Sequence, residues 1–170
     1  IASGENLYYS ESDLPEQVPG ANLIAVGSDI KALVATTGSL YIFAEDGVYR
    51  IPYAEHPEQF RVVKETNIGC AYLHGATGLG SLMAYANRDG VWLFDGRKPV
   101  LISEPVHDFV ENADDISLAF DAVHACLHVF VTRSGGTWPP YYLVYNLTQK
   151  TWVRRDGRWY ALGGATACLN

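Results

Sequence analysis

The chain has 170 residues, of which 48% are hydrophobic and 18% charged, so it can bury a core and is not intrinsically disordered. Its formal net charge is −7 and it contains no run of basic residues, which excludes a charge-based nucleic-acid footprint. Cys70, Cys126 and Cys168 are far apart and form no Cys-x-x-Cys pair, so no zinc site is expected. No stretch is long and apolar enough to be a membrane-spanning segment.

Taken in chain order, short apolar and aromatic runs broken by turn residues predict β-strands along the whole chain. Runs at 7–10 and 23–26 come before three units of four strands each, and a last run at 159–162 follows them. The expected strands are 31–36, 40–44, 48–51 and 60–64 in the first unit, 72–76, 82–87, 91–94 and 100–102 in the second, and 117–123, 127–132, 142–145 and 152–154 in the third.

The first two units carry the same motif. Each has Ser-Leu, then apolar and aromatic residues, then Asp-Gly-Val followed by Tyr or Trp. The turns Asp46-Gly47 and Asp89-Gly90 lie 43 positions apart, and a β-propeller blade repeats at about 40–50 residues. We expect each glycine to lie in the tight turn itself, at a positive φ that glycine adopts without a Cβ clash.

The chain is therefore predicted to be an all-β protein, built from antiparallel four-stranded blades of a β-propeller. One short helix is expected at 104–111, with Ser103 as its N-cap, between the second and third blades. The propeller domain, or fragment of one, spans 1–170, with nearly complete blades at about 29–65, 66–106 and 107–156 and half-blades at 1–28 and 157–170.

No group of residues has the pattern of a catalytic or metal site. The adjacent acids Asp114 and Asp115 would point to opposite faces of a strand, so they cannot act together on one substrate. His124 and His128 would share one face of a strand, but no third ligand accompanies them. We therefore expect no enzyme activity, no cofactor and no metal ion.

A succession of motifs extends over nearly the whole chain, at 6–16, 22–27, 89–96, 101–109 and 143–152. In this order they resemble the propeller proteins of tailed-phage virions, namely the tail hub, nozzle or tail-tubular proteins of short-tailed phages and those called DNA-stabilisation proteins. The chain is far shorter than a typical member of that group. The resemblance implies a structural component of a bacteriophage tail or head–tail connector, assembled in the host bacterial cytoplasm and located in the virion.

The same resemblance implies that copies of the chain and other virion proteins form a ring around the DNA channel. An acidic channel would let phage DNA pass without sequence-specific binding, because it repels phosphates.

The alternative is a cellular β-propeller that presents loops to a protein or glycan partner. Trp138, Tyr141 and Tyr142 lie in or directly after the irregular loop 134–140, and His56 lies in the loop 53–59, so these four are the expected partner contacts. Packing against a neighbouring blade is the other interpretation of the three aromatic residues. A glycan-processing propeller would need carboxylates from different blades to converge, and no motif favours it.

Overall fold

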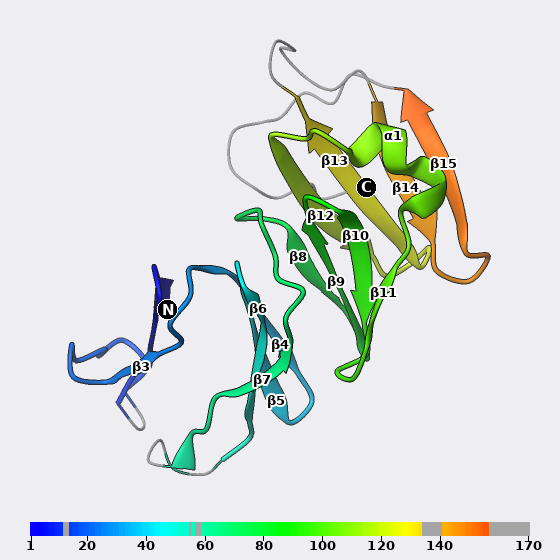
Figure 1. Ribbon diagram of the computed structural model, residues 1–170. Coiled ribbons are helices and arrows are strands. Elements are labelled where there is room, and N and C mark those ends of the chain that lie inside the picture. The colour runs from blue at the N-terminus through cyan, green and yellow to red at the C-terminus, as the bar shows by residue number, and fades with distance from the viewer. Residues whose placement is uncertain (12–13, 55, 57–58, 134–140, 157–170) are drawn as a thin grey trace.

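The computed structural model describes residues 1–11, 14–54, 56, 59–133 and 141–156. They form four antiparallel sheets that follow one another in chain order (Figure 1). The first sheet has three strands, and each of the other three has four. The half-blade predicted at 157–170 lies outside the described residues.

Each sheet is an up-and-down meander, in which every strand pairs with the next one along the chain. Two short helices, η2 (Glu104–Val106) and α1 (His107–Val110), lie in the connection between the third and fourth sheets. The strands are β1 (Ala2–Ser3), β2 (Asn6–Tyr8) and β3 (Leu23–Ala25); β4 (Ile30–Thr36), β5 (Ser39–Ala44), β6 (Gly47–Pro52) and β7 (Val63–Thr66); β8 (Ala76–Leu79), β9 (Leu82–Asn87), β10 (Gly90–Phe94) and β11 (Pro99–Leu101); and β12 (Asp115–Asp121), β13 (Cys126–Thr132), β14 (Tyr141–Asn146) and β15 (Thr151–Asp156).

The first strands of the four-stranded sheets, β4, β8 and β12, contact one another in succession. Gly78 of β8 lies so close to β4 that a Cβ there would be 3.1 Å from Val34 Cγ1. The backbone N–H of Leu118 in β12 donates to the carbonyl oxygen of His74, 3.0 Å away. Four-stranded meanders joined at their first strands are the blades of a β-propeller. The predicted all-β fold of propeller blades is therefore confirmed.

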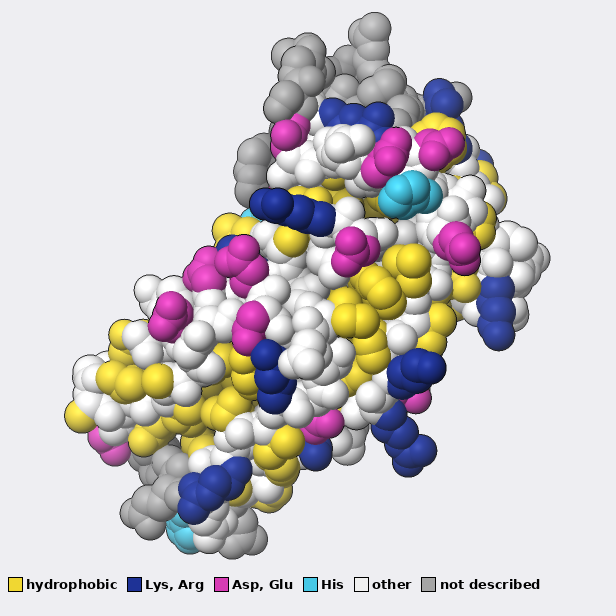
Figure 2. Space-filling view, in the orientation of Figure 1, with side chains coloured by type: hydrophobic (Ala, Val, Ile, Leu, Met, Phe, Trp, Pro, Cys, Tyr) yellow, Lys and Arg dark blue, Asp and Glu magenta, His cyan; other side chains and the backbone are white. Residues whose placement is uncertain are grey.

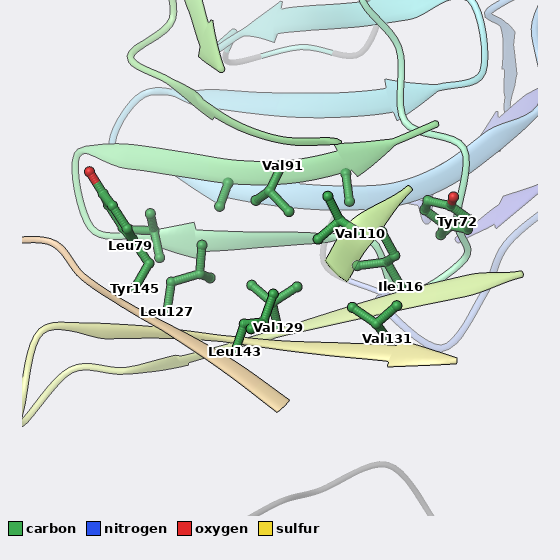
Figure 3. Packing of buried hydrophobic residues seen from close by; sticks show 12 residues of the cluster. Tyr72, Leu79, Val91, Val110, Ile116, Leu127, Val129, Val131, Leu143 and Tyr145 are labelled. Atoms are coloured by element: carbon green, nitrogen blue, oxygen red, sulfur yellow. The ribbon is translucent and has the colours of Figure 1, made fainter. Parts of the chain in front are cut away.

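The core lies between the sheets, in three clusters of buried apolar side chains. In β9, Met83 and Tyr85 pack toward β4–β7, whereas Ala84 and Ala86 pack toward β12–β15, and all four are at most 1% exposed. Figure 3 shows the cluster between β8–β11 and β12–β15. Because successive side chains alternate across a sheet, a blade covered on both faces is apolar at every position of its central strand.

Tyr85 carries a buried hydroxyl for which the described residues provide no hydrogen-bond partner. An unpaired buried hydroxyl costs about 1–3 kcal/mol. Tyr85→Phe removes only that oxygen, so it is expected to leave the free energy of unfolding unchanged or to raise it by about 1 kcal/mol. Urea unfolding of the two proteins measures the difference, and a loss of more than about 1 kcal/mol would mean that the hydroxyl is hydrogen-bonded.

The glycines of the two Asp-Gly hairpins lie outside the tight turns in which we expected them. Each is the first residue of the following strand, after a two-residue loop. Gly47 has no positive φ, and glycine is needed there because a Cβ would overlap the carbonyl oxygen of Thr66. At Gly90, φ is 141° and a Cβ would overlap Oγ of Ser103. The glycines therefore make room for the chain that passes beside each hairpin.

The first strand of the second blade was predicted at 72–76, but β8 begins only at Ala76. The preceding residues instead connect the blades. The Tyr72 hydroxyl donates to the carbonyl oxygen of Ala113, which lies just before β12 (3.3 Å). Apolar residues in this segment are thus buried by packing between blades rather than by pairing in a sheet.

Other boundaries also shift. β7 begins at Val63 rather than at 60, and the two strands predicted before the first blade are joined by a third, β1, of only two residues. The helix predicted at 104–111 is divided into η2 and α1.

No helix among the described residues is long and apolar enough to cross a membrane.

Ser103 does not cap the helix with its side chain. It is fully buried, and its Oγ accepts a hydrogen bond from the backbone N–H of Val91, 3.0 Å away. The prediction of an N-cap was wrong because the hydroxyl satisfies a buried backbone donor of the neighbouring strand instead.

Candidate interaction surface

The sheet β12–β15 has one face against β8–β11 and a second face that points away from it. The first face carries Leu127, Val129, Leu143 and Tyr145 in the buried cluster. Because successive side chains of a strand point to opposite faces, the residues between them belong to the second face, which we call the outer face. The apolar and aromatic side chains of the outer face are Ala119, Phe130, Tyr142, Val144 and Val153, and its polar and charged ones include Asp115, Ser117, Asp121, His128, Thr132, Thr151 and Arg155.

A row of side chains with little polarity crosses the outer face from the first strand to the last. Ala119 is paired with His128, His128 with Val144, and Val144 with Val153. Four strands spaced about 4.8 Å apart make this row about 14 Å wide. A sheet with water on one side alternates apolar and polar residues. The outer face therefore combines this apolar row with polar and charged residues on either side of it.

Three rings form a stack beside this row. Phe130 and Tyr142 have centroids 5.5 Å apart, His128 and Tyr142 are 5.7 Å apart, and His128 and Phe130 are 6.4 Å apart. The interplanar angles are between 16° and 24°. Aromatic side chains are enriched in protein interfaces, since they offer a large contact area and lose little conformational entropy. The stack is thus a rigid platform suited to contact with another surface.

His128 lies in the middle of the row, is 9% exposed, and has no hydrogen-bond partner for Nε2. Burial lowers the pKa of His128 below its ordinary value of 6.5. The carboxylate of Asp121 opposes this shift, whereas Arg155 and His124 add to it. The ring is therefore held neutral at neutral pH, where it can take part in an apolar contact.

Acid is expected to destabilise the fold through His128. Its pKa is lower in the folded chain, so its contribution is complete above about pH 6.5 and is lost as the pH falls through the folded-state pKa. His128→Phe keeps a ring in the stack and removes the titration. Its free energy of unfolding should vary less than that of the wild type between about pH 4 and pH 7.

His74→Gln is the control for this titration, because His74 is an exposed histidine outside the outer face. It should retain the pH dependence of the wild type. Equal pH dependence in the wild type and in His128→Phe, measured by urea unfolding, would contradict the prediction.

Of the expected contact residues whose side chains the structure describes, Tyr142 lies on the outer face and His56 does not. Tyr142 belongs to the aromatic stack. Tyr141 begins β14 and is paired with Asp156 through the backbone, but its side chain and the whole of Trp138 lie outside the description. His56 is exposed in the connection between β6 and β7, and no described contact joins it to Tyr142.

His128 and Phe130, which stack with Tyr142, were not among the expected contact residues, although the sequence contains a signal for them. Every position from Leu127 to Val131 is apolar or aromatic, apart from the histidine. Such a run indicates a strand covered on both faces rather than on one.

A second feature is an acidic end of the blades. In an up-and-down meander, the middle hairpin turn and the connection to the next sheet lie at the same end. Figure 2 shows acidic side chains spread over the face that it draws, with Lys and Arg side chains among them. The exposed acids of these turns and connections are Glu45, Asp46, Asp89, Glu104, Asp108 and Asp114.

Within this end, Asp46 is held by a network of hydrogen bonds. Its carboxylate accepts hydrogen bonds from Tyr49 (2.8 Å) and Lys64 (2.6 Å). Desolvation raises the pKa of Asp46, but these bonds together with Ser28 outweigh it and lower the pKa to about 2. The group is thus charged at physiological pH and joins the first hairpin to β7.

The structure does not place the two histidines named above on the same strand. His124 lies in the turn after β12 rather than in a strand, with Nδ1 2.6 Å from Oδ2 of Asp121. Among the described residues, no three His, Cys, Asp or Glu side chains are grouped so as to hold a metal ion. The absence of enzyme activity and of a cofactor stays a prediction.

Comparisons with known proteins add little. No family model matches the chain, and no curated protein matches it. Among solved structures, Hsv2 from Kluyvelomyces marxianus aligns over 93% of this chain and 79% of its own, with a TM-score of 0.33 and 11% sequence identity. A similarity this low carries no argument about fold or function, so the fold assignment depends on the sheets themselves.

Proposed function

We propose that the chain is a structural module of a ring-shaped assembly in a bacteriophage tail or head–tail connector, and that it acts through protein contacts rather than chemistry. The observation that carries this proposal is the outer face of β12–β15. This sheet lies at one end of the described molecule, and its outer face carries an apolar row and an aromatic stack. A row and stack of this kind are suited to contact with another protein surface.

The order of sequence motifs supports the phage setting, since it resembles propeller proteins of short-tailed phages. The acidic end of the blades fits a channel that lets DNA pass. Asp114 and Asp115 lie at the start of β12, a first strand, where they would repel phosphates. Replacing both with lysine should slow DNA release from the particle, and an unchanged rate would remove these acids from that role.

The proposal is tested by imaging the purified chain with negative-stain electron microscopy and by sequencing the genes next to its own. Ring-shaped particles, together with portal and capsid genes nearby, are the expected results. Isolated single copies at every concentration, with cellular genes as neighbours, would overturn the proposal.

The alternative function is a binding module that presents loops to a protein or glycan, and one observation favours it. Tyr53 is 76% exposed and lies three residues before the exposed His56 in the β6–β7 connection. An exposed tyrosine at a loop is a frequent interface anchor. On a glycan array, specific binding that Tyr53→Ala abolishes would favour this function over the structural one, and no binding would count against it.

A further inference from the structure

We propose that Asp89, in the hairpin between β9 and β10, is a modification site at which the folded chain isomerises spontaneously to isoaspartate. The backbone nitrogen of Gly90 forms a bond to Cγ of Asp89, while the hydroxyl of the protonated carboxyl group and the N–H hydrogen leave as water. The cyclic succinimide then takes up water at either carbonyl carbon, which gives aspartate or isoaspartate. The reaction needs no oxidant, reductant or cofactor, and it is independent of the proposed function.

A glycine after an aspartate favours this reaction, because the approach of the backbone nitrogen is not hindered by a Cβ. Among the described residues, three aspartates are followed by a described glycine, namely Asp46, Asp89 and Asp95. All three aspartates are exposed. Sequence and exposure therefore do not distinguish the three sites, and the hydrogen bonds of each carboxylate decide between them.

The carboxylate of Asp46 is held in place and kept ionised. It accepts hydrogen bonds from the Tyr49 hydroxyl (2.8 Å) and from Nζ of Lys64 (2.6 Å). Desolvation raises the pKa of Asp46, but its hydrogen bonds outweigh this effect and lower the pKa to about 2. The protonated form, which is the form that loses water, is therefore more than about tenfold rarer at neutral pH than in an ordinary aspartate.

The carboxylate of Asp95 is held by its own turn. Its Oδ1 accepts hydrogen bonds from the backbone N–H groups of Arg97 (2.9 Å) and Lys98 (3.1 Å). The hydrogen bonds from Lys98 and Arg97 lower the pKa of Asp95. This carboxylate is therefore also ionised, and it is oriented toward the residues after Gly96 rather than toward the glycine nitrogen.

Asp89 differs from both, because no described residue donates a hydrogen bond to its carboxylate or forms an ion pair with it. The turn is held by Asn87 instead. Oδ1 of Asn87 accepts hydrogen bonds from the backbone N–H groups of Asp89 (2.9 Å) and Gly90 (3.2 Å). The Asp89 side chain can therefore rotate toward the nitrogen of Gly90.

The two hairpins that contain Asp46 and Asp89 are otherwise alike. Each aspartate is the second residue of a two-residue loop, and each glycine begins the following strand. The repeat in the chain therefore supplies an internal control, in which the partners of the carboxylate differ and the position in the hairpin does not.

Isomerisation would disturb the packing of this hairpin, because isoaspartate adds one carbon to the backbone. Gly90 lies so close to Ser103 that a Cβ would overlap Oγ of Ser103, which accepts a hydrogen bond from the Val91 N–H (3.0 Å). A longer turn cannot keep Gly90 paired with Asn87 and also keep this contact. Amide hydrogen exchange at Val91 should be about fivefold faster in the isoaspartate form, and unchanged exchange would contradict this effect.

The test compares the three sites in the full chain after weeks in neutral buffer at physiological temperature, once folded and once unfolded in guanidinium chloride. Endoproteinase Asp-N cleaves before aspartate but not before isoaspartate, so uncleaved peptides of unchanged mass measure the modification at each site. In the folded chain, isoaspartate should form about tenfold faster at Asp89 than at Asp46, and also faster than at Asp95. In guanidinium chloride the rates at the three sites should become similar.

A variant that carries both Tyr49→Phe and Lys64→Met tests the reason for the difference, because it removes the two donors that hold Asp46. Isoaspartate at Asp46 should then rise about tenfold, with no change at Asp89. Lys98→Met is the matched control, since only the backbone of Lys98 holds Asp95, and it should change none of the three rates.

Three results in the wild-type chain would overturn the proposal, and none of them depends on whether the double variant folds. The first is no isoaspartate at Asp89 in the folded chain. The second is formation at Asp46 or Asp95 that is as fast as at Asp89. The third is the same ratio of rates in the folded and the unfolded chain, which would mean that the local sequence and not the structure selects the site.

Discussion

Replacing Phe43 with alanine is expected to lower the free energy of unfolding by about 3–5 kcal/mol, the usual cost of emptying a buried phenylalanine site. Phe43 is 0% exposed and packs between β4–β7 and β8–β11, with its ring centroid 5.3 Å from that of Tyr85. Neither sheet can move into the space without losing its own strand pairing. The loss should therefore be near the upper end of this range.

Phe130→Ala is the matched control, because Phe130 also lies in the second strand of a four-stranded sheet but belongs to the outer face. Urea unfolding at a concentration that keeps the chain monomeric should show less than about half the loss seen for Phe43→Ala. Equal losses would mean that Phe130 is deeply packed within one copy, which contradicts the role assigned to the outer face.

Replacing Val153 with aspartate is expected to weaken self-association by about 100-fold or more. Val153 ends the apolar row of the outer face and is 44% exposed, so the change should cost the folded monomer little. In the assembly the new carboxylate would be buried without a partner. That burial costs about 3 kcal/mol or more, and each 1.4 kcal/mol corresponds to about a tenfold change in affinity.

Light scattering over a series of concentrations measures this effect. Val100→Asp is the control, since Val100 is 55% exposed in β11, the last strand of the preceding sheet, and is not an outer-face residue. It should associate like the wild type. Equal weakening by both substitutions would point to a general effect of added negative charge rather than to a contact at the outer face.

The sequence allowed most of the strands to be predicted, because a strand whose two faces are both covered is a nearly continuous apolar run. The central strand β9 is an example, because the residues from Met83 to Ala86 are buried on both of its faces. The recurrence of Asp-Gly-Val after 43 positions also indicated successive blades. Pairing within a meander is local, so a sequence pattern can capture it.

Features that depend on contacts between distant segments could not be predicted in the same way. Gly47 is required by the approach of Thr66, and Ser103 is used by a donor of β10. The sequence pattern predicts that Tyr72 lies in a strand, but Tyr72 is buried because it lies between blades. In each case the cause is a neighbour that sequence spacing does not reveal.

The interaction surface was predicted only in part. Tyr142 was chosen because it follows an irregular loop. In the structure, its candidacy depends instead on its stacking with Phe130 and His128. The loop criterion selected exposed positions, but the outer face is a sheet surface. Inspection of the side chains on both faces of β13 and β14, rather than of the loops, would have identified it.

The central claim, that copies of the chain associate into a ring-shaped assembly, is tested most directly by the mass of the chain in solution. Sedimentation equilibrium of the wild type over a wide range of concentrations should show association into species of two or more copies, with dissociation on dilution. A single mass equal to that of one chain, at every concentration, would contradict the claim.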